Sequence, residues 1–418
     1  MITHGETRHG TPRAAFAHRA YRWIFLGSFA SNIGTWMQNV ALLAFADDIS
    51  RSSAYVGIIT FAQLGPMLFL SPFAGLLADA VDRKRLMITA AAVQGAMSVA
   101  LAAVASSDQP NQVFIVLCVL GIGIAAAVNG PAAQATLPAL VPRADLSGAV
   151  ALNSAQMNAS RVLGPLLAVI PFLHSPSVVF LFNAATYLFV IAAVSIVKFD
   201  SLPVPHANTE GPLHKVMGGV RAARENPVIG RALITVSVFS LFSLVFIYQM
   251  AGFARERLEL PDERFRLLFG SFGLGAAIGA IAVGTRLRGV DRTVLVRWGL
   301  AGFAVSLAAF GLLTTPGPAY VLVALTGFGY FVVITALSTA IQHEVTDAAR
   351  GRVMGLWMMA WAGLVPVGSL FAGFVIDSTG YPPILLGGAV VAAALIPVAN
   401  LRGATPEPPD PAPQSDFL

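Results

Sequence analysis

Charge and cysteine are both scarce in this chain of 418 residues. Only 11% of the residues are charged, and a single cysteine, Cys118, leaves no pair for a disulfide and no cluster for a cysteine metal site. A soluble domain of this length would need far more polar surface to cover its core, whereas 56% of these residues are hydrophobic. The composition therefore excludes a soluble globular protein and indicates one that spans a membrane several times.

Sequence motifs for nucleotide and metal chemistry are missing as well. The glycine-rich stretch 273–279 lies inside an apolar run and follows no strand, so we interpret Gly275 and Gly279 as a close helix-packing pair. The segment that starts at His343 lacks the second histidine of a zinc protease helix, and the chain has no P-loop. We predict no cofactor, no metal and no enzymatic activity, because nucleophile, base and metal ligands do not gather on one face.

Long apolar runs, in contrast, are abundant. Twelve of them reach the roughly 20 residues that a helix needs to cross a hydrocarbon layer. They are continuously rich in Ala, Leu and Gly and lack the alternation of barrel strands, so the predicted fold is all-α and integral to the membrane. We expect spans at 21–46, 53–78, 86–105, 112–137, 151–173, 177–197, 228–253, 265–285, 294–313, 319–342, 352–376 and 381–400.

The positions of lysine and arginine predict the orientation of these spans. Most of the 26 basic residues fall on the cytoplasmic side when both termini lie in the cytoplasm. The net charge of +5 is then a topology signal, and we predict no binding to nucleic acid. The first apolar run is too long for a secretory signal peptide, so we expect a multi-pass protein of the inner or plasma membrane, with the lipid bilayer as its surroundings.

A comparison of the two halves of the chain predicts an internal duplication. One shift of 204 positions relates three separated places: Gly75 to Gly279, Val141 to Val345, and Gly164 to Gly368. We expect a cytoplasmic tail at 1–20, a six-helix half at 21–197, a cytoplasmic linker at 198–227, a second six-helix half at 228–400 and a disordered cytoplasmic tail at 401–418.

A charged hairpin, GLLADAVDRKR at 75–85, follows the second apolar run. Its residues Gly75, Asp79, Arg83 and Lys84 resemble the cytoplasmic signature of the major facilitator superfamily, and the segments 137–168 and 343–357 resemble its exporter branch that contains the enterobactin efflux proteins. The resemblance covers nearly the whole chain. It implies two pseudo-symmetric six-helix halves, a small-molecule substrate, alternating access, the proton as coupling ion and a monomeric state.

We interpret the hairpin as a conformational latch. The resemblance implies that Asp79 meets the positive N-terminal end of the eleventh helix near Arg352. Such a contact contributes about 0.3–1 kcal/mol at a surface and up to about 2 kcal/mol when partly buried, which biases two nearly equal conformations. The alternative is that Arg83 and Lys84 only fix the topology and bind anionic lipid.

Arg161 stands near the middle of the fifth span, where a guanidinium costs at least about 2.5–3.5 kcal/mol unless it faces water or a partner. It shares a polar helical stripe with Ser154, Asn158 and Pro165. We therefore predict a site for an anionic or hydrogen-bonding substrate, and a structural arginine bonded to neighbouring helices is the alternative. Gly164 and Pro165 match the antiporter motif that the resemblance places in the fifth helix, so they are candidates for a kink or gate.

Polar residues also follow one face of the first span. The resemblance implies that the first, fourth, seventh and tenth helices line a central cavity, and hydrogen bonding between helices is the alternative role for such residues. The predicted substrate contacts, beside Asn158 and Arg161, are Asn32, Thr35, Trp36, Asn39, Asn129 and Gln249.

Carboxylates are few within the spans. Asp47 and Asp48 close the first span on the outer side and are the best candidates for a proton site, although both can simply mark the helix end. We expect a secondary active exporter of a small amphipathic molecule, either drug-like or siderophore-like. The alternatives are an importer or uniporter of a small metabolite, and a membrane sensor or assembly protein that does not transport.

Overall fold

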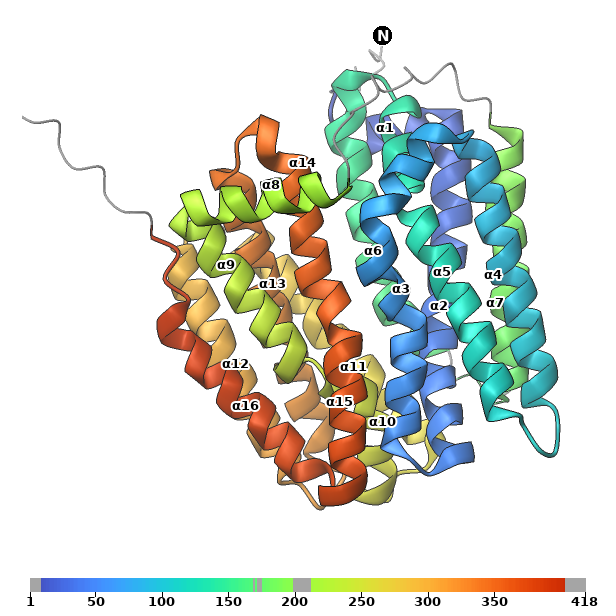
Figure 1. Cartoon of the computed structure of the whole chain (residues 1–418), viewed down its shortest axis with the longest axis vertical. Coiled ribbons are helices and arrows are strands. Elements are labelled where there is room, and N and C mark those ends of the chain that lie inside the picture. The colour runs from blue at the N-terminus through green and yellow to red at the C-terminus, as the bar shows by residue number, and fades with distance from the viewer. Residues whose placement is uncertain (1–8, 168–169, 171–174, 198–211, 403–418) are drawn as a thin grey trace, which may run out of the picture.

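The computed structural model describes residues 9–167, 170, 175–197 and 212–402, and within them the side chains of residues 71–80, 135, 158, 212–215, 262–263 and 347–348 are outside the description. The described chain forms helices and no strand (Figure 1). They are α1 (Pro12–Ala17), α2 (Arg19–Ser50), α3 (Ser53–Ala80), α4 (Arg83–Ala105), α5 (Gln112–Thr136), η1 (Leu137–Ala139), η2 (Arg143–Asp145), α6 (Leu146–Leu167), α7 (Pro176–Ile196), α8 (Pro212–Glu225), α9 (Pro227–Val238), η4 (Phe239–Ser243), α10 (Phe246–Glu256), α11 (Asp262–Gly284), α12 (Arg292–Gly311), α13 (Ala319–Glu344), α14 (Asp347–Met358), η5 (Met359–Gly363), α15 (Leu364–Thr379) and α16 (Tyr381–Val398).

Helices occupy all twelve predicted positions. Ten are long and apolar enough to cross a membrane; α2 and α6, at the first and fifth predicted positions, are not among these ten, and the count of twelve spans stays a prediction. The seventh and eleventh positions each contain one turn of π-helix, η4 and η5, which the sequence analysis does not anticipate. Such turns insert one extra residue and occur frequently at functional sites.

Polar residues mark where several of these helices begin. The side-chain oxygens of Asp82, Asn111, Asn226 and Asp291 each accept a hydrogen bond of 2.9–3.1 Å from a backbone N–H in the first turn of α4, α5, α9 and α12. These caps satisfy donors that a helix start would otherwise leave unpaired. The sequence thus fixes the start of a helix where an apolar run follows Asp or Asn.

The helices pack as two bundles, α2 to α7 and α9 to α16, with α8 lying across the second (Figure 1). The first bundle contains buried polar contacts, such as the hydrogen bond of 2.9 Å from Asn183 Nδ2 to Gln38 Oε1. The second has an aromatic core in which Phe239 and Phe303 lie 4.8 Å apart, and Phe253 and Phe310 lie 4.6 Å apart, between ring centroids. Both polar bonds and aromatic contacts therefore hold each bundle together, since Phe45 and Phe180 also pair in the first and Thr326 bonds Ser306 in the second.

Gly275 and Gly279 are a close helix-packing pair, as predicted. A side chain at Gly275 would collide with the carbonyl of Ala324 on α13, and one at Gly279 would come within 2.6 Å of the carbonyl oxygen of Phe328. Small residues at this spacing let two helix backbones approach closely.

The two ends of the molecule differ. The bundles diverge toward the end that carries α1 and α8, here called the α1 end, and converge at the opposite end near α10, here called the closed end (Figure 1). Between the bundles, α3 packs against α15 and α6 packs against α11. At the closed end glycine permits this approach, since a side chain at Gly373 would collide with the backbone of Ser53.

The first described residues dock at the α1 end through one buried carboxylate, Asp145. Its oxygens accept a hydrogen bond of 3.1 Å from the backbone N–H of Gly10 and lie 3.2 Å from His9 Nδ1 and 2.9 Å from His18 Nε2. The hydroxyl of Tyr21 donates to the backbone oxygen of Ala149 at 2.9 Å. These contacts fasten α1 to the start of α6.

Candidate functional site

Arg161 of α6 lies between the two bundles inside a group of aromatic rings. Its guanidinium carbon is 5.5 Å from the ring centroid of Trp36, 5.2 Å from that of Phe331 and 5.7 Å from that of Trp361. Trp36 belongs to the first bundle, and Phe331 and Trp361 belong to the second. We call these four residues the arginine cage. Each cation–π contact contributes about 0.5–2 kcal/mol, which offsets part of the cost of the charge.

Local backbone features position the cage. A side chain at Gly164 would lie 2.5 Å from Trp36 Cβ, so glycine allows α6 to pack closely on α2 and sets the distance between Arg161 and Trp36. Trp361 lies within the π-helical turn η5, and its indole N–H donates a hydrogen bond of 2.9 Å to the hydroxyl of Tyr330. That bond fixes the orientation of the indole ring beside the guanidinium.

The arginine in this cage keeps unused donor capacity. Its Nε is buried without a hydrogen-bond acceptor, and Arg161 takes part in no ion pair within the described residues. Its polar neighbours include the hydroxyls of Tyr330 and Tyr248. A buried donor without an acceptor costs about 1–3 kcal/mol, and more when it is charged. An anionic group of a bound molecule would supply the missing acceptor.

The polar stripe of the first span is divided between two roles. Trp36 joins the cage, and Asn32 is partly exposed on α2. Thr35, in contrast, lies 3.3 Å from the hydroxyl of Tyr187 on α7. Asn39 accepts a hydrogen bond of 2.6 Å from the side chain of Gln63 on α3. Thr35 and Asn39 therefore form hydrogen bonds within the first bundle, and their contact with a substrate stays a prediction.

The remaining predicted cavity residues lie in different surroundings. Asn129 has a buried side-chain oxygen with no hydrogen-bond partner in the described part of the chain, which suits a polar ligand contact. The side chain of Asn158 is outside the described residues. Gln249 is 2% exposed and donates to the backbone oxygen of Ser53 at 3.2 Å, so it joins the two bundles at the closed end, and its contact with a substrate stays a prediction. Pro165 is buried within α6.

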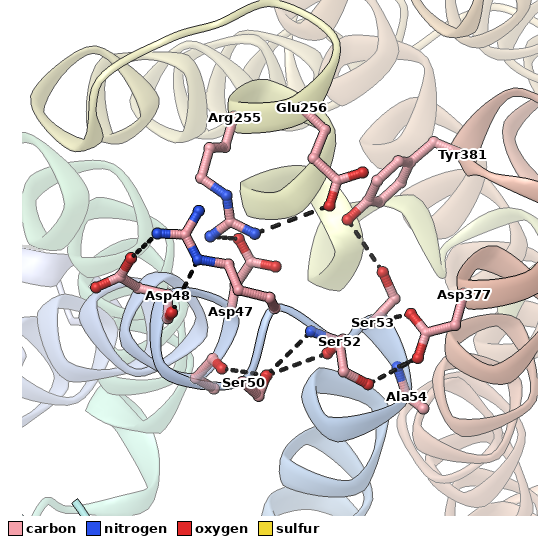
Figure 2. Close-up of polar contacts among 12 residues, drawn as sticks. Asp47, Asp48, Ser50, Ser52, Ser53, Ala54, Arg255, Glu256, Asp377 and Tyr381 are labelled. Carbon is pink, nitrogen blue, oxygen red and sulfur yellow. Dashed lines mark hydrogen bonds and ion pairs between the residues drawn. The ribbon is translucent and has the colours of Figure 1, made fainter. Parts of the chain in front are cut away.

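Asp47 and Asp48 differ sharply in their surroundings at the closed end (Figure 2). Asp47, 3% exposed at the end of α2, forms an ion pair with Arg255 of α10, which belongs to the second bundle. Asp48 is exposed and pairs locally with Arg51 at 2.9 Å. Of the two predicted proton sites, only Asp47 therefore connects the bundles.

Asp377 of α15 completes this closure by capping α3 from the other bundle. Its carboxylate accepts hydrogen bonds from the backbone N–H of Ser53 at 2.7 Å and of Ala54 at 3.2 Å, and from the hydroxyl of Ser52 at 2.7 Å (Figure 2). The Ser53 hydroxyl also donates to that of Tyr381 at 3.0 Å. A carboxylate at a helix start is stabilised by the helix dipole as well as by these bonds.

The charged hairpin is described only in part. The side chains of Gly75 and Asp79 are outside the described residues, so the latch contact of Asp79 stays a prediction. Lys84 donates to the backbone oxygens of Ser195 at 2.7 Å and Val197 at 3.0 Å, at the C-terminal end of α7. Arg83 opens α4 beside it. Lys84 thus ties two helices within one bundle, where a cation also complements the helix dipole.

Sequence reasoning missed most partners of these sites. Phe331 and Trp361 look like ordinary apolar core residues within their spans, although Tyr330 and Trp361 each carry a polar atom near the middle of a span, which could have singled them out. Arg255 is one of several charges in a short polar segment, and nothing in its spacing distinguishes it from its neighbours. Pairing across the bundles is visible only once the fold is known.

Comparison with known proteins assigns the family. Residues 10–412 match the family model described as transmembrane secretion effector. The chain belongs to this family. The enterobactin exporter EntS of Escherichia coli O1:K1 / APEC is 26% identical over 344 residues, with 81% of each chain covered, and EntS of Shigella boydii serotype 18 gives the same identity and coverage.

Solved structures support the fold of this family member. The nucleoside transporter NupG has a TM-score of 0.70 at 13% identity and covers 91% of this chain and 98% of its own. A bacterial homologue of the iron transporter ferroportin has a TM-score of 0.70 at 12% identity, with 91% and 98% covered. The predicted all-α transporter fold and the resemblance to the exporter branch are confirmed, and the chain is a multi-pass membrane transport protein.

Proposed function

We propose that this transporter exports a small amphipathic molecule that carries an aromatic ring and an anionic group, bound at the arginine cage. The observation that supports this most directly is a guanidinium with a free donor among Trp36, Phe331 and Trp361. A guanidinium binds carboxylate or phenolate oxygens through charge-assisted hydrogen bonds. The rings beside it can stack on an aromatic part of the same molecule.

The cage also suits alternating access, because it is built from both bundles. Phe331 and Trp361 belong to the second bundle, whereas Arg161 and Trp36 belong to the first. Any rocking of the bundles changes the distances between the guanidinium and two of its three rings. A substrate bound there is therefore held differently in the two states, which is what couples binding to the conformational change.

The orientation predicted from lysine and arginine makes the α1 end cytoplasmic and the closed end external. In that orientation the bundles are joined on the outside by Asp47 with Arg255 and by Asp377 with the start of α3. We propose that this arrangement is the inward-facing state, which takes up substrate from the cytoplasm. Export then requires the external contacts to break.

We further propose that a proton breaks them at Asp47. Among the described carboxylates, Asp47 and Asp145 are the buried ones, and only Asp47 lies between the bundles. Protonation of Asp47 removes the charge that holds Arg255, so external protons would favour opening to the outside. This assigns the role predicted for Asp47 or Asp48 to Asp47.

The relatives suggest a first compound for the binding test. Their name specifies enterobactin, so enterobactin and simple aromatic carboxylates are the probes, added to the purified full chain while quenching of tryptophan fluorescence is measured. Arg161→Gln should weaken binding about 10- to 100-fold, since a hydrogen bond to a charged group contributes about 1.5–3 kcal/mol. Arg161→Lys keeps the charge but loses the planar arrangement of guanidinium donors, so its affinity should lie between those of the wild type and Arg161→Gln.

Arg221→Gln is the matched control, because Arg221 is exposed on α8 and pairs there with Glu225. It should bind like the wild type. Export is tested in cells stripped of their own exporters, with and without a protonophore. Equal binding by the wild type and Arg161→Gln would contradict the arginine cage as the binding site. Export that persists in the presence of the protonophore would contradict proton coupling but not the binding site.

A further inference from the structure

An apolar groove runs along the outer face of the second bundle, on α12 and α13, away from the arginine cage. Its volume is about 570 Å³, and none of its lining residues belongs to the cage. Trp298 and Val305, on its wall, are 76% and 72% exposed. In a membrane protein such a face lies against lipid, so an apolar chain of a lipid can enter the groove.

A polar cleft adjoins the groove at the α1 end of the same bundle. The cleft measures about 860 Å³ and shares the lining residues Leu287, Val290 and Leu295 with the groove, so the two hollows are neighbours. It lies between the segment that joins α11 to α12, the end of α13 and the last described residues of the chain. Its charged or titratable lining residues are Arg288, Asp291, Arg292, His343, Glu344 and Arg402.

The charges of this cleft leave two arginines uncompensated. Asp291 lies 3.7 Å from Arg402, and Glu344 accepts a hydrogen bond of 3.2 Å from Asn226, so both acids already have partners. Arg288 and Arg292 take part in no ion pair with a described residue. The cleft therefore presents two guanidinium groups next to the apolar groove.

We propose that this composite hollow binds an anionic phospholipid, with the phosphate of the headgroup at Arg288 and Arg292 and one acyl chain in the groove. Basic pockets next to apolar helix faces are the usual recognition chemistry for acidic headgroups. Trp298 suits such a place, because tryptophan favours the membrane interface. A free phosphate would leave the groove unused, whereas a lipid would fill the cleft with its headgroup and the adjoining groove with an acyl chain.

The headgroup arm of the test uses the purified full chain and two lipids with identical acyl chains, phosphatidylglycerol and phosphatidylcholine. Native mass spectrometry measures how much of each lipid stays bound. The wild type should prefer phosphatidylglycerol. Each basic residue near the membrane surface raises the affinity for an anionic lipid about fivefold, so Arg288→Gln/Arg292→Gln should weaken phosphatidylglycerol binding about 25-fold and remove the preference.

The control is Arg85→Gln/Arg143→Gln, which removes two exposed arginines of the first bundle that do not line the cleft. It lowers the net charge equally, and we expect a change of less than about threefold, because distant exposed charges are screened. An equal loss in both double variants would mean that net charge alone attracts the lipid, and this would overturn the site.

The acyl-chain arm fills the groove. A Cβ atom at Gly302 meets open space and Gly302 lines the groove, so Gly302→Leu adds volume to the groove and favours the helix. Gly387→Leu is its control, also at an open position of a helix but outside the groove. Gly302→Leu should weaken phosphatidylglycerol binding about tenfold, whereas glycerol 3-phosphate should not compete. Unchanged binding by Gly302→Leu together with displacement by glycerol 3-phosphate would show a soluble phosphate site and overturn the lipid proposal.

Discussion

The carboxylate of Asp145 binds the first described residues of the chain. Its hydrogen bond with His18, and then the bond from the Gly10 amide, lower its pKa from the ordinary 3.8 to about 2. Because this pKa is depressed, the carboxylate stabilises the docked state at pH values above about 4, and this contribution is lost as the pH falls from about 4 to about 2. A label on α1 should therefore report release of α1 in that pH window.

Asp145→Asn should release α1 at neutral pH as well, because a neutral amide is a weaker hydrogen-bond acceptor for His18 and the Gly10 N–H than a carboxylate. Arg13 lies within α1, so trypsin should cut there faster in the variant than in the wild type. Asp108→Asn, at an exposed acid in the loop between α4 and α5, is the control and should leave cleavage unchanged. Equal cleavage in all three proteins would mean that apolar packing alone holds α1.

Arg161 could be singled out from the sequence, whereas its surroundings could not. A lone charge in an apolar span carries a cost that must be met, and this makes the residue conspicuous without any structure. Its partners Phe331 and Trp361 lie 170 or more positions away and are chemically ordinary in their own helices. The sequence therefore identifies Arg161 as a charge that needs a partner, and it leaves open whether a ligand or the protein supplies that partner.

At the scale of helices, the duplication appears as a repeated contact. Gly123 of α5 packs against the Gln63 carbonyl of α3, and Gly327 of α13 packs against the Phe272 carbonyl of α11. The two glycines are related by the same shift of 204 positions that relates Gly75 to Gly279. Each half thus keeps one close crossing between its equivalent helices.

Gly327→Ala should lower the free energy of unfolding by about 1–3 kcal/mol, because the added methyl group collides with the backbone of α11. Gly387→Ala is the matched control in α16, where a methyl group meets open space. It should be neutral or stabilising by up to about 1 kcal/mol. Thermal unfolding in detergent, followed by intrinsic fluorescence, measures both. A stable Gly327→Ala protein would show that α11 and α13 can separate without cost.

Helix positions follow from the sequence better than helix irregularities do. Continuous apolar runs and the caps at Asp82 and Asp291 specify where elements lie. The π-helical turns η4 and η5 leave no such mark in the sequence. Trp361 lies within η5, so this part of the site could not be predicted from apolar runs and caps.

At the scale of the whole molecule, polar contacts join the two bundles at one end. The closed end joins the bundles through Asp47 with Arg255, Asp377 with the start of α3, and Gln249 with the Ser53 backbone. These three contacts hold the bundles together at this end, and each can be removed singly.

Arg255→Gln should open the closed end most strongly, because it leaves the buried Asp47 carboxylate without a partner. Asp47→Asn should have a smaller effect, since Arg255 is 21% exposed and remains partly solvated. Removing one partner of a buried ion pair costs about 3–5 kcal/mol. Because Arg255 is partly exposed, we expect a cost of about 2 kcal/mol for Arg255→Gln, which shifts the ratio of open to closed molecules about thirtyfold. Asp48→Asn, next in sequence but exposed and paired with Arg51, is the control.

Spin labels at Asp108→Cys and Gly317→Cys measure this opening, because both positions are exposed in loops at the closed end, one on each bundle. The native Cys118 is buried and does not compete for the label. A longer distance component should grow in the order wild type, Asp47→Asn, Arg255→Gln, with Asp48→Asn like the wild type. If external acid produces the same component in the wild type but adds nothing in Asp47→Asn, the proton acts at Asp47. Acid opening that persists in Asp47→Asn would place the proton elsewhere.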